Sequence, residues 1–186
     1  MPDVIPIVMR MDGPDEILAA AAAGGDARAF SDLLERHYDR IFRLAFRLTG
    51  MAAEAEDLTQ DVCLALPAKL AGFRGDARFT TWLYRVVVNA ATDRRRKAIR
   101  HARAADGWGD VEVARQAETA ETRDALDWLT AAMRQLPEDL RDTLALVLDD
   151  LTHAEAATVL GVSEGTISWR ISEAKKRLRA IKESEA

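Results

Sequence analysis

The stretch that decides the fold covers residues 151–181 and reads LTHAEAATVLGVSEGTISWRISEAKKRLRAI. Thr152 and Glu155 stand three residues apart, which is the spacing of a capping box that opens a helix. Gly161 supplies the left-handed residue that ends this helix, and Ser163 is a favourable cap for the next one. Two helices joined by so short a turn form a helix-turn-helix, in which the second helix enters the major groove of DNA.

The second helix of this pair has one apolar side and one polar side. At spacings of three and four residues, the apolar side consists of Ile167, Ile171, Ala174, Leu178 and Ile181. The opposite side carries hydroxyls, cations and one large ring, namely Ser168, Trp169, Ser172, Lys175, Lys176 and Arg179. The cations favour DNA binding over the alternative, a generic helical hairpin. Since Trp169 lies away from the apolar side, it touches DNA or a partner protein, or it packs under a preceding helix.

A second segment, residues 73–97, reads FRGDARFTTWLYRVVVNAATDRRRK and mixes four aromatic rings with seven Lys or Arg side chains. On a helix from about 79 to 100, one face carries Trp82, Arg85, Asn89, Arg96 and Arg100. Cations bind backbone phosphates, and rings stack on unpaired bases. Because the bases of a closed duplex are already stacked, the combination indicates single-stranded or opened DNA. The alternative is a solvated basic helix whose Trp82 and Tyr84 belong to the core.

The charge is segregated along the sequence, although the chain as a whole has a formal net charge of −5. Residues 69–103 carry 10 basic and 2 acidic side chains, whereas residues 104–150 carry 4 basic and 12 acidic ones. A local basic cluster fits a nucleic-acid site whatever the overall charge. The acidic stretch 104–118 also loses all helical periodicity, so it is expected to be a flexible linker.

The remaining sequence predicts further helices and no strands. They are expected over residues 15–23, 30–48, 55–70 and 119–135, with another starting at Pro137. Pro67 falls inside the third of these helices, so we expect a bend or break near Leu66. The predicted fold is therefore all-α, with two small helical domains joined by the acidic flexible linker and the helix-turn-helix in the C-terminal one.

Several classes of protein are disfavoured by what the sequence lacks. No apolar run approaches the roughly 18 residues of a membrane span, and the N-terminal MPDVIPIVMRMDGP has no basic region of a secretion signal, so we expect a cytoplasmic protein. Cys63 is the only cysteine, and His37, His101 and His153 share no metal-ligand spacing. We therefore expect no internal disulfide, no metal and no cofactor. No catalytic set of side chains is visible either, and no enzyme activity is expected.

Four blocks in this order resemble the extracytoplasmic-function sigma factors of bacterial RNA polymerase. They are AF…LL…HYDRIFRLAFRLTG (29–50), AEDLTQDV (55–62), the basic segment from 73 to 96, and residues 136–178 around the helix-turn-helix. The resemblance covers about residues 15–180. It implies a disordered N-terminal segment 1–14, a sigma region 2 domain 15–103, the linker 104–118 and a sigma region 4 domain 119–186.

The resemblance implies two surfaces on the first domain. One docks on the clamp helices of the largest polymerase subunit through Glu56, Asp57, Leu58, Gln60 and Asp61. The other holds a base flipped out of the −10 element and melts the promoter, through Phe73, Arg74, Gly75, Asp76, Phe79, Trp82, Tyr84, Arg85, Asn89, Arg94, Arg95 and Arg96. Unstacking a base costs a few kcal/mol, and a pocket with rings and hydrogen-bonding groups compensates for that cost.

The resemblance also implies that the second domain reads the −35 element and sits on the flap of the other large subunit. The expected contacts are Ser163, Glu164, Gly165, Thr166, Ser168, Trp169, Arg170, Ser172, Lys175 and Lys176. The chain departs from the family here, since Ser168 and Trp169 stand where a basic residue and Ser are common, and Glu173 where Arg is frequent. A glutamate repels phosphates, so Glu173 either accepts from a cytosine amine or does not face DNA.

The family's partners are core RNA polymerase, promoter DNA and an anti-sigma factor that holds the subunit inactive. One alternative is a helix-turn-helix regulator that is not a polymerase subunit, which would need a sensing domain upstream. Another is an enzyme acting on nucleic acid, which would need carboxylates near the basic stripe. Asp76 and Asp93 are the carboxylates found there.

Overall fold

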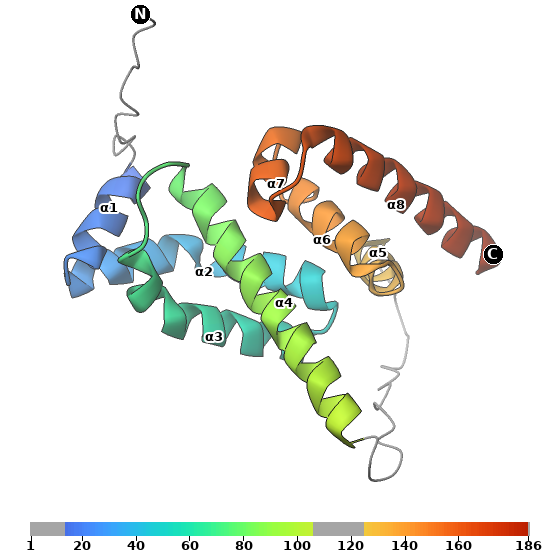
Figure 1. The fold of residues 1–186 in the computed structure, drawn as a ribbon, viewed down its shortest axis with the longest axis horizontal. Coiled ribbons are helices and arrows are strands. Elements are labelled where there is room, and N and C mark those ends of the chain that lie inside the picture. Colours follow the sequence, from blue (N-terminus) through green and yellow to red (C-terminus); the bar gives the residue numbers. More distant parts are fainter. Residues whose placement is uncertain (1–13, 106–124, 186) are drawn as a thin grey trace, which may run out of the picture.

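The computed structural model describes residues 14–105 and 125–185, and within them it is all-α (Figure 1). The helices are α1 (Pro14–Ala23), α2 (Ala27–Thr49), α3 (Ala52–Leu70), α4 (Phe79–Ala105), α5 (Ala125–Arg134), α6 (Glu138–Val147), α7 (His153–Leu160) and α8 (Glu164–Ser184). The predicted disordered segment, except Pro14, and the predicted linker, except its first two residues, lie outside the described residues. None of the described helices is both long and apolar enough to cross a bilayer.

The first four helices form one domain around a shared apolar core. Asp26 caps α2 by accepting the backbone N–H groups of Arg28 at 2.9 Å and Ala29 at 3.0 Å. Gly50 ends that helix with a φ of +73°, a left-handed conformation that favours glycine. The apolar side of α2, which includes Leu33, Ile41, Leu44 and Leu48, is buried, and the helix packs against α3 and α4.

Pro67 does not interrupt its helix, so the break that the sequence allowed near Leu66 does not occur. Helix α3 runs on to Leu70, and Pro67 lies in its last turn. The neighbouring Leu66 and Leu70 are 3% and 0% exposed, so core packing holds the helix on both sides of the proline. Pro67 itself is exposed, and its missing N–H removes one hydrogen bond of the helix, a cost that the packing of Leu66 and Leu70 offsets.

Helix α1 ties down the start of α4, a link that the sequence did not reveal. The Glu16 carboxylate accepts the backbone N–H of Phe79 at 2.8 Å and so supplies the cap of α4. Asp15 binds Nε2 of His37 at 3.0 Å, and the His37 ring lies 5.2 Å from that of Phe79. Burial lowers the pKa of His37, and Asp15 opposes that change.

The second domain contains the predicted helix-turn-helix in α7 and α8. The capping box is present, since Thr152 and Glu155 accept each other's backbone N–H groups at 3.2 and 3.0 Å. Gly161 closes α7 with a φ of +67°, and Ser163 caps α8 by accepting the N–H of Thr166 at 3.1 Å. The stripe that includes Ile167 faces the domain core, as predicted.

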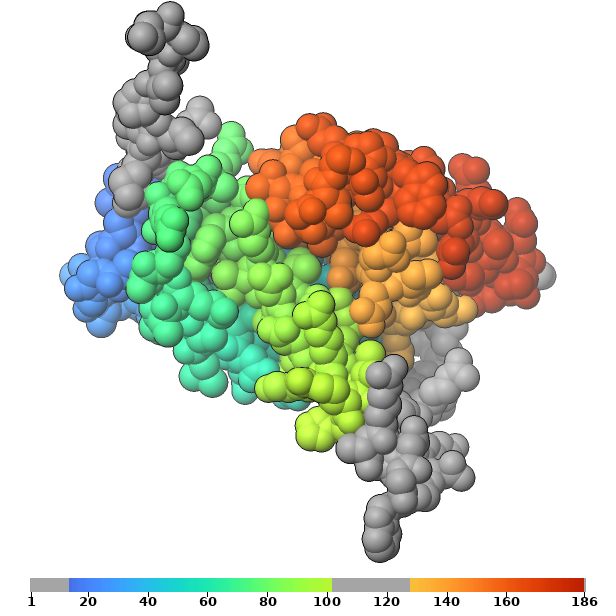
Figure 2. Space-filling model, in the orientation of Figure 1, coloured from blue at the N-terminus to red at the C-terminus, as the bar shows by residue number. Residues whose placement is uncertain are grey.

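The two domains lie against each other, with α6 packed on α2 and α7 packed on α4 (Figures 1 and 2). The end of α5 lies close to the end of α2. The side chain of Arg134 packs directly against Gly50 and leaves no room for a Cβ at that position. In Figure 2 the α7 region covers one end of α4. This interface decides which of the basic side chains are accessible.

Candidate nucleic-acid interface

A hollow of about 220 Å³ opens beside the loop that joins α3 to α4. Gly75 shapes the loop with a φ of +73°. The hollow is lined by Gly72, Phe73, Arg74, Gly75, Asp76, Ala77, Thr81, Trp82 and Arg85. The structure therefore brings together six residues that the sequence assigned to base capture, and adds Gly72, Ala77 and, from the first turn of α4, Thr81.

Two aromatic rings, Phe73 and Trp82, line this hollow, and Phe79, which was expected to contact the base, lies behind them. The Phe73 and Trp82 ring centroids are 5.3 Å apart, and each lies 5.6 Å from the ring of Phe79. Phe79 is 1% exposed and acts as the support, whereas Phe73 and Trp82 are half-buried and expose part of their surfaces. A partly exposed, supported ring is a surface on which an unpaired base can stack.

Asn89 and Arg96 lie further along the exposed face of α4. Within the described part of the chain, neither side chain has a hydrogen-bond or ion-pair partner. They are therefore available to a ligand that follows α4 away from the hollow. The predicted face of α4 is present, with Arg85 at the hollow and Arg100 near the far end of the helix.

Tyr84 lies elsewhere than expected. It is 4% exposed, does not line the hollow, and donates its hydroxyl hydrogen bond to Asp149 after the end of α6. Burial, reinforced by Asp149, raises the pKa of this phenol well above its ordinary value. Arg47 and Arg43 of α2 also pair with Asp149, so this carboxylate joins the two domains.

Two predicted DNA-binding arginines of α4 also contact the second domain. Arg95 forms a two-point ion pair with Asp142 of α6, with N–O distances of 3.1 and 2.6 Å, and its Nε lies 3.3 Å from Glu138. Arg85 donates to the backbone carbonyl of Thr158 in α7. Burial raises the pKa of Asp142, while the bound Arg95 opposes that change. In this arrangement the second domain occupies cations that the sequence assigned to DNA.

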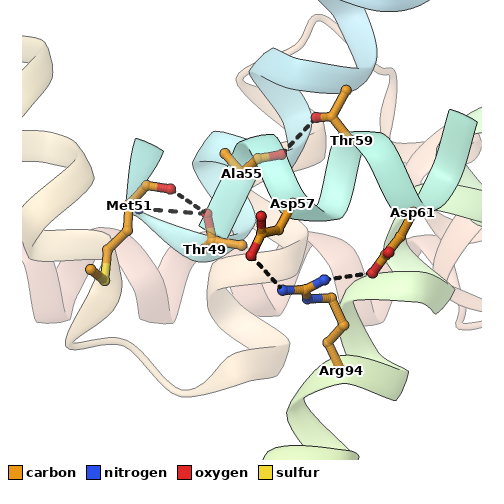
Figure 3. A network of polar contacts seen from close by, with 7 residues as sticks. All are labelled: Thr49, Met51, Ala55, Asp57, Thr59, Asp61 and Arg94. Atoms are coloured by element: carbon orange, nitrogen blue, oxygen red, sulfur yellow. Dashed lines mark hydrogen bonds and ion pairs between the residues drawn. The ribbon is translucent and has the colours of Figure 1, made fainter. Parts of the chain in front are cut away.

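The outer face of α3 carries the acidic residues expected to bind polymerase, and Arg94 lies on it (Figure 3). Its guanidinium pairs with Asp61 at 2.5 Å and with Asp57 at 3.4 Å. Glu56 and Gln60 are exposed on the same helix. A cation assigned to DNA thus binds two carboxylates assigned to polymerase.

Leu58 does not belong to this outer face, and its assignment as a polymerase contact is wrong. It is 0% exposed, because it continues the buried stripe of Ala55 and Val62 at spacings of three and four residues. Leu64 is 81% exposed and was missed. It lies three residues beyond Asp61, on the same side of α3, and this spacing is the signal that could have found it.

On α8 the exposed face is the one that the sequence predicted. Trp169 is 61% exposed, so the alternative in which it packs under a preceding helix is wrong. Lys175 and Lys176 are exposed as well, whereas Arg170 is half-buried with its Nε 3.4 Å from Asp139. The remaining expected contacts lie in the cap and first turns of this helix.

Glu173 binds Arg177 of the same helix, with Oε1 2.9 Å from Nε. This hydrogen bond is the main cause that lowers the pKa of Glu173. The carboxylate is therefore paired with a cation one turn away. The repulsion of phosphates that an unpaired glutamate would cause is correspondingly weaker.

The chain matches two protein-family models in the same order as its two domains. Residues 33–101 match sigma-70 region 2, and residues 126–178 match sigma-70 region 4. Among curated relatives, ECF RNA polymerase sigma factor SigM of Mycobacterium tuberculosis H37Rv is 36% identical over 176 residues, covering 92% of this chain and 86% of the relative. RNA polymerase sigma-H factor of Pseudomonas aeruginosa PAO1 is 32% identical, covering 88% and 91%.

Two solved structures resemble the whole fold. Sigma factor RpoE of Bartonella quintana, in complex with the anti-sigma factor NepR, gives a TM-score of 0.69 at 25% identity, covering 86% of this chain and 100% of that one. CnrH in complex with the cytosolic domain of CnrY gives 0.67 at 27% identity, covering 92% and 99%.

Fold and motifs together define a two-domain protein of the sigma-70 class. Within that class, the sequence identity to SigM and the share of both chains that it covers assign the group. The chain belongs to the ECF sigma factors of RNA polymerase.

Proposed function

We propose that this chain is a promoter-specificity subunit of RNA polymerase, and that it recognises −10 and −35 elements and starts transcription without catalytic activity of its own. The observation that carries the proposal is the presence, in one chain, of a ring-lined hollow and a helix-turn-helix. The proposed partners are promoter DNA and core RNA polymerase, and the proposed place of action is therefore the cytoplasm. The proposed domains are residues 15–103 and 119–186, with the linker 104–118 between them.

The hollow is proposed to hold a base flipped from the −10 element. A flipped base needs a stacking surface and hydrogen-bonding groups at its edge. Phe73 and Trp82 offer the surface, while Asp76, Thr81 and Arg85 offer acceptors and donors around it. Asn89 and Arg96 extend the contact along the exposed strand, and Arg74 lies at the rim of the hollow.

The exposed face of α3 is proposed to bind the polymerase clamp. On this face Gln60 and Asp61 lie one turn before the exposed Leu64, and Glu56 and Asp57 lie two turns before it. An apolar anchor surrounded by polar residues is a common arrangement in protein interfaces. Arg94 pairs with two of these carboxylates, so a basic partner would compete with it for them.

Polymerase binding is further proposed to separate the two domains. The contacts of Tyr84, Arg85 and Arg95 with the second domain join surfaces that must reach DNA elements far apart along the promoter. An anti-sigma factor would favour the closed arrangement. This partner is proposed because CnrH and RpoE, which share the fold, were solved with CnrY and NepR.

The experiment adds the purified chain to sigma-free bacterial core polymerase on a library of promoter fragments and maps transcript starts. Start-site-specific transcription supports the proposal. The helix-turn-helix regulator that is not a polymerase subunit would bind DNA without conferring any start site, and that outcome would contradict it. A double variant, Trp82→Ala with Asn89→Ala, should still bind core polymerase and should lose initiation.

A further inference from the structure

The first two turns of α8 are the part of the recognition helix that meets base edges in a helix-turn-helix. Most of their polar side chains already have intramolecular partners. Ser163 and Thr166 bind each other at 2.9 Å, and Ser168 lies 3.1 Å from Nδ1 of His153. Ser172, one turn on, donates to the backbone of Ser168. These hydroxyls stabilise the helix-turn-helix through hydrogen bonds within the protein, so they are less available to DNA bases.

Two long side chains in these turns have no partner in the described part of the chain, Glu164 and Trp169. Glu164 carries a negative charge at the helix start, where DNA phosphates would repel it. Trp169 is 61% exposed and stands in the second turn, on the side opposite the buried Ile167 and Ile171. Trp169 is therefore the side chain best placed to distinguish one base from another.

The surroundings of Trp169 favour DNA over a protein partner. Its neighbours on the helix surface are Ser168, Ser172 and Glu173, the last of which is paired with Arg177, and Lys176 and Arg179 lie further along the same side. An isolated ring in a polar and basic face is unlike the core of a protein interface, where apolar groups gather. Cations on the same face can bind the backbone while the ring reaches into the groove.

The chemistry of indole selects the base. Indole has one N–H donor, no acceptor, and an apolar ring edge. In the major groove, thymine presents an O4 acceptor beside an apolar C5-methyl group, and no other base presents that pair. We propose that Trp169 reads a thymine of the −35 element, with its ring edge on the methyl group and its N–H on O4. This inference rests on the proposed function.

The experiment uses holoenzyme assembled from the full chain and core polymerase, on a promoter that supports initiation. Each thymine of the −35 element is replaced in turn by deoxyuridine, which removes the methyl group alone. At one position we expect the affinity of the wild-type holoenzyme to fall about fourfold, the value for one buried methyl group. Trp169→Ala should bind thymine and deoxyuridine at that position equally well.

A second substitution tests the N–H. At the same position, 5-methylcytosine opposite guanine keeps the methyl group and puts a donor where O4 was. The wild type should lose affinity, whereas Trp169→Phe should keep the methyl dependence and lose discrimination at O4. Circular dichroism of both variants reports whether α8 is intact.

The outcomes separate this inference from the proposed function. A holoenzyme that initiates normally but is insensitive to every deoxyuridine overturns the thymine contact alone. Equal sensitivity in wild type and Trp169→Ala also overturns it, because another residue then reads the methyl group. A chain that gives no initiation with core polymerase contradicts the proposed function instead.

Discussion

Arg95 of α4 and Asp142 of α6 form a two-point ion pair across the boundary between the two domains, with N–O distances of 3.1 and 2.6 Å. Both side chains are largely withdrawn from water, at 18% and 9% exposure. Removal of Asp142 leaves the largely buried Arg95 with only the longer contact to the exposed Glu138, which destabilises the arrangement that buries Arg95. The pair therefore makes the closed form depend on both charges.

Replacing Asp142 with Asn should open the domains. Arg95 can regain water only if α6 moves away, so the variant should have a larger radius of gyration in small-angle scattering. The free chain should also bind DNA more tightly at low salt, because Arg95 is released. Asp139→Asn is the matched control, since Asp139 is more exposed and pairs with Arg170 inside its own domain. Identical scattering of Asp142→Asn and wild type would contradict the role given to the pair.

Truncating Glu16 should weaken the first domain by about 1 kcal/mol, the usual value of a helix cap. Glu16→Ala leaves the N–H of Phe79 without its acceptor, whereas Glu16→Gln keeps an acceptor and loses the charge that favours a helix start. In urea unfolding, the free energy of unfolding should be highest for the wild type, lower for Glu16→Gln and lowest for Glu16→Ala. Ile17→Ala, at an exposed position of the same helix, should be nearly neutral. Equal stability of all four proteins would show that this cap is unimportant.

Acid should destabilise the first domain through His37. Burial lowers the pKa of His37 in the folded protein, so the unfolded chain binds the proton more readily. The neutral ring contributes fully to the free energy of unfolding above about pH 6.5, the ordinary pKa of histidine. This contribution is lost as the pH falls from 6.5 toward the lowered pKa of the folded state. Thermal unfolding at pH 7.5 and 5.5 measures the loss, and His37→Gln should reduce the difference. A wild-type melting temperature that does not fall would disagree with this sign.

Trp82→Ala should impair promoter opening more than polymerase binding. A stacked base contributes about 1–3 kcal/mol, which corresponds to a loss of about 5- to 150-fold in the open complex. Fluorescence of 2-aminopurine in the −10 element reports opening, and titration of labelled core reports binding. Tyr38→Ala removes an exposed ring of α2 that does not line the hollow, and should change neither. Equal losses in opening and binding would place Trp82 outside the base pocket.

Leu64→Ala should weaken binding to core polymerase about tenfold without loss of stability. The side chain is 81% exposed, so the free protein gains little from it, whereas burial at an interface would contribute about 1.5–3 kcal/mol. Competition against a labelled sigma factor measures the affinity, and urea unfolding checks the stability. Unchanged affinity would remove Leu64 from the polymerase surface.

Local patterns in the sequence predicted local structure well. The capping box at Thr152, the left-handed Gly161 and the apolar stripe of α8 each depend on residues a few positions apart, and the structure confirms them. The helix does not break at Pro67, because core packing of Leu66 and Leu70 outweighs the local preference. Leu58 was misassigned because its block was matched as a whole, although its periodicity already placed it in the core.

Contacts between the domains could not be predicted in the same way. Arg95 and Asp142 are 47 positions apart, and nothing in either neighbourhood specifies the other. The basic run at 94–96 reads as one cationic surface, yet Arg94 pairs with α3, Arg95 pairs with α6, and Arg96 has no partner in the described residues. Three consecutive arginines have three different environments because a helix turns about 100° at each residue.

The closed interface also changes how salt should act on the free chain. Cationic side chains bind DNA more weakly at high salt, because the release of counterions condensed on the DNA then contributes less free energy. Salt also screens the carboxylates of Asp142 and Glu138 that hold Arg95 against the second domain, so it frees a cation that it also makes less effective. The two effects have opposite signs. Carboxylates of the second domain therefore act as counterions within the chain. The dependence of DNA affinity on salt concentration will then indicate fewer phosphate contacts than the open form makes.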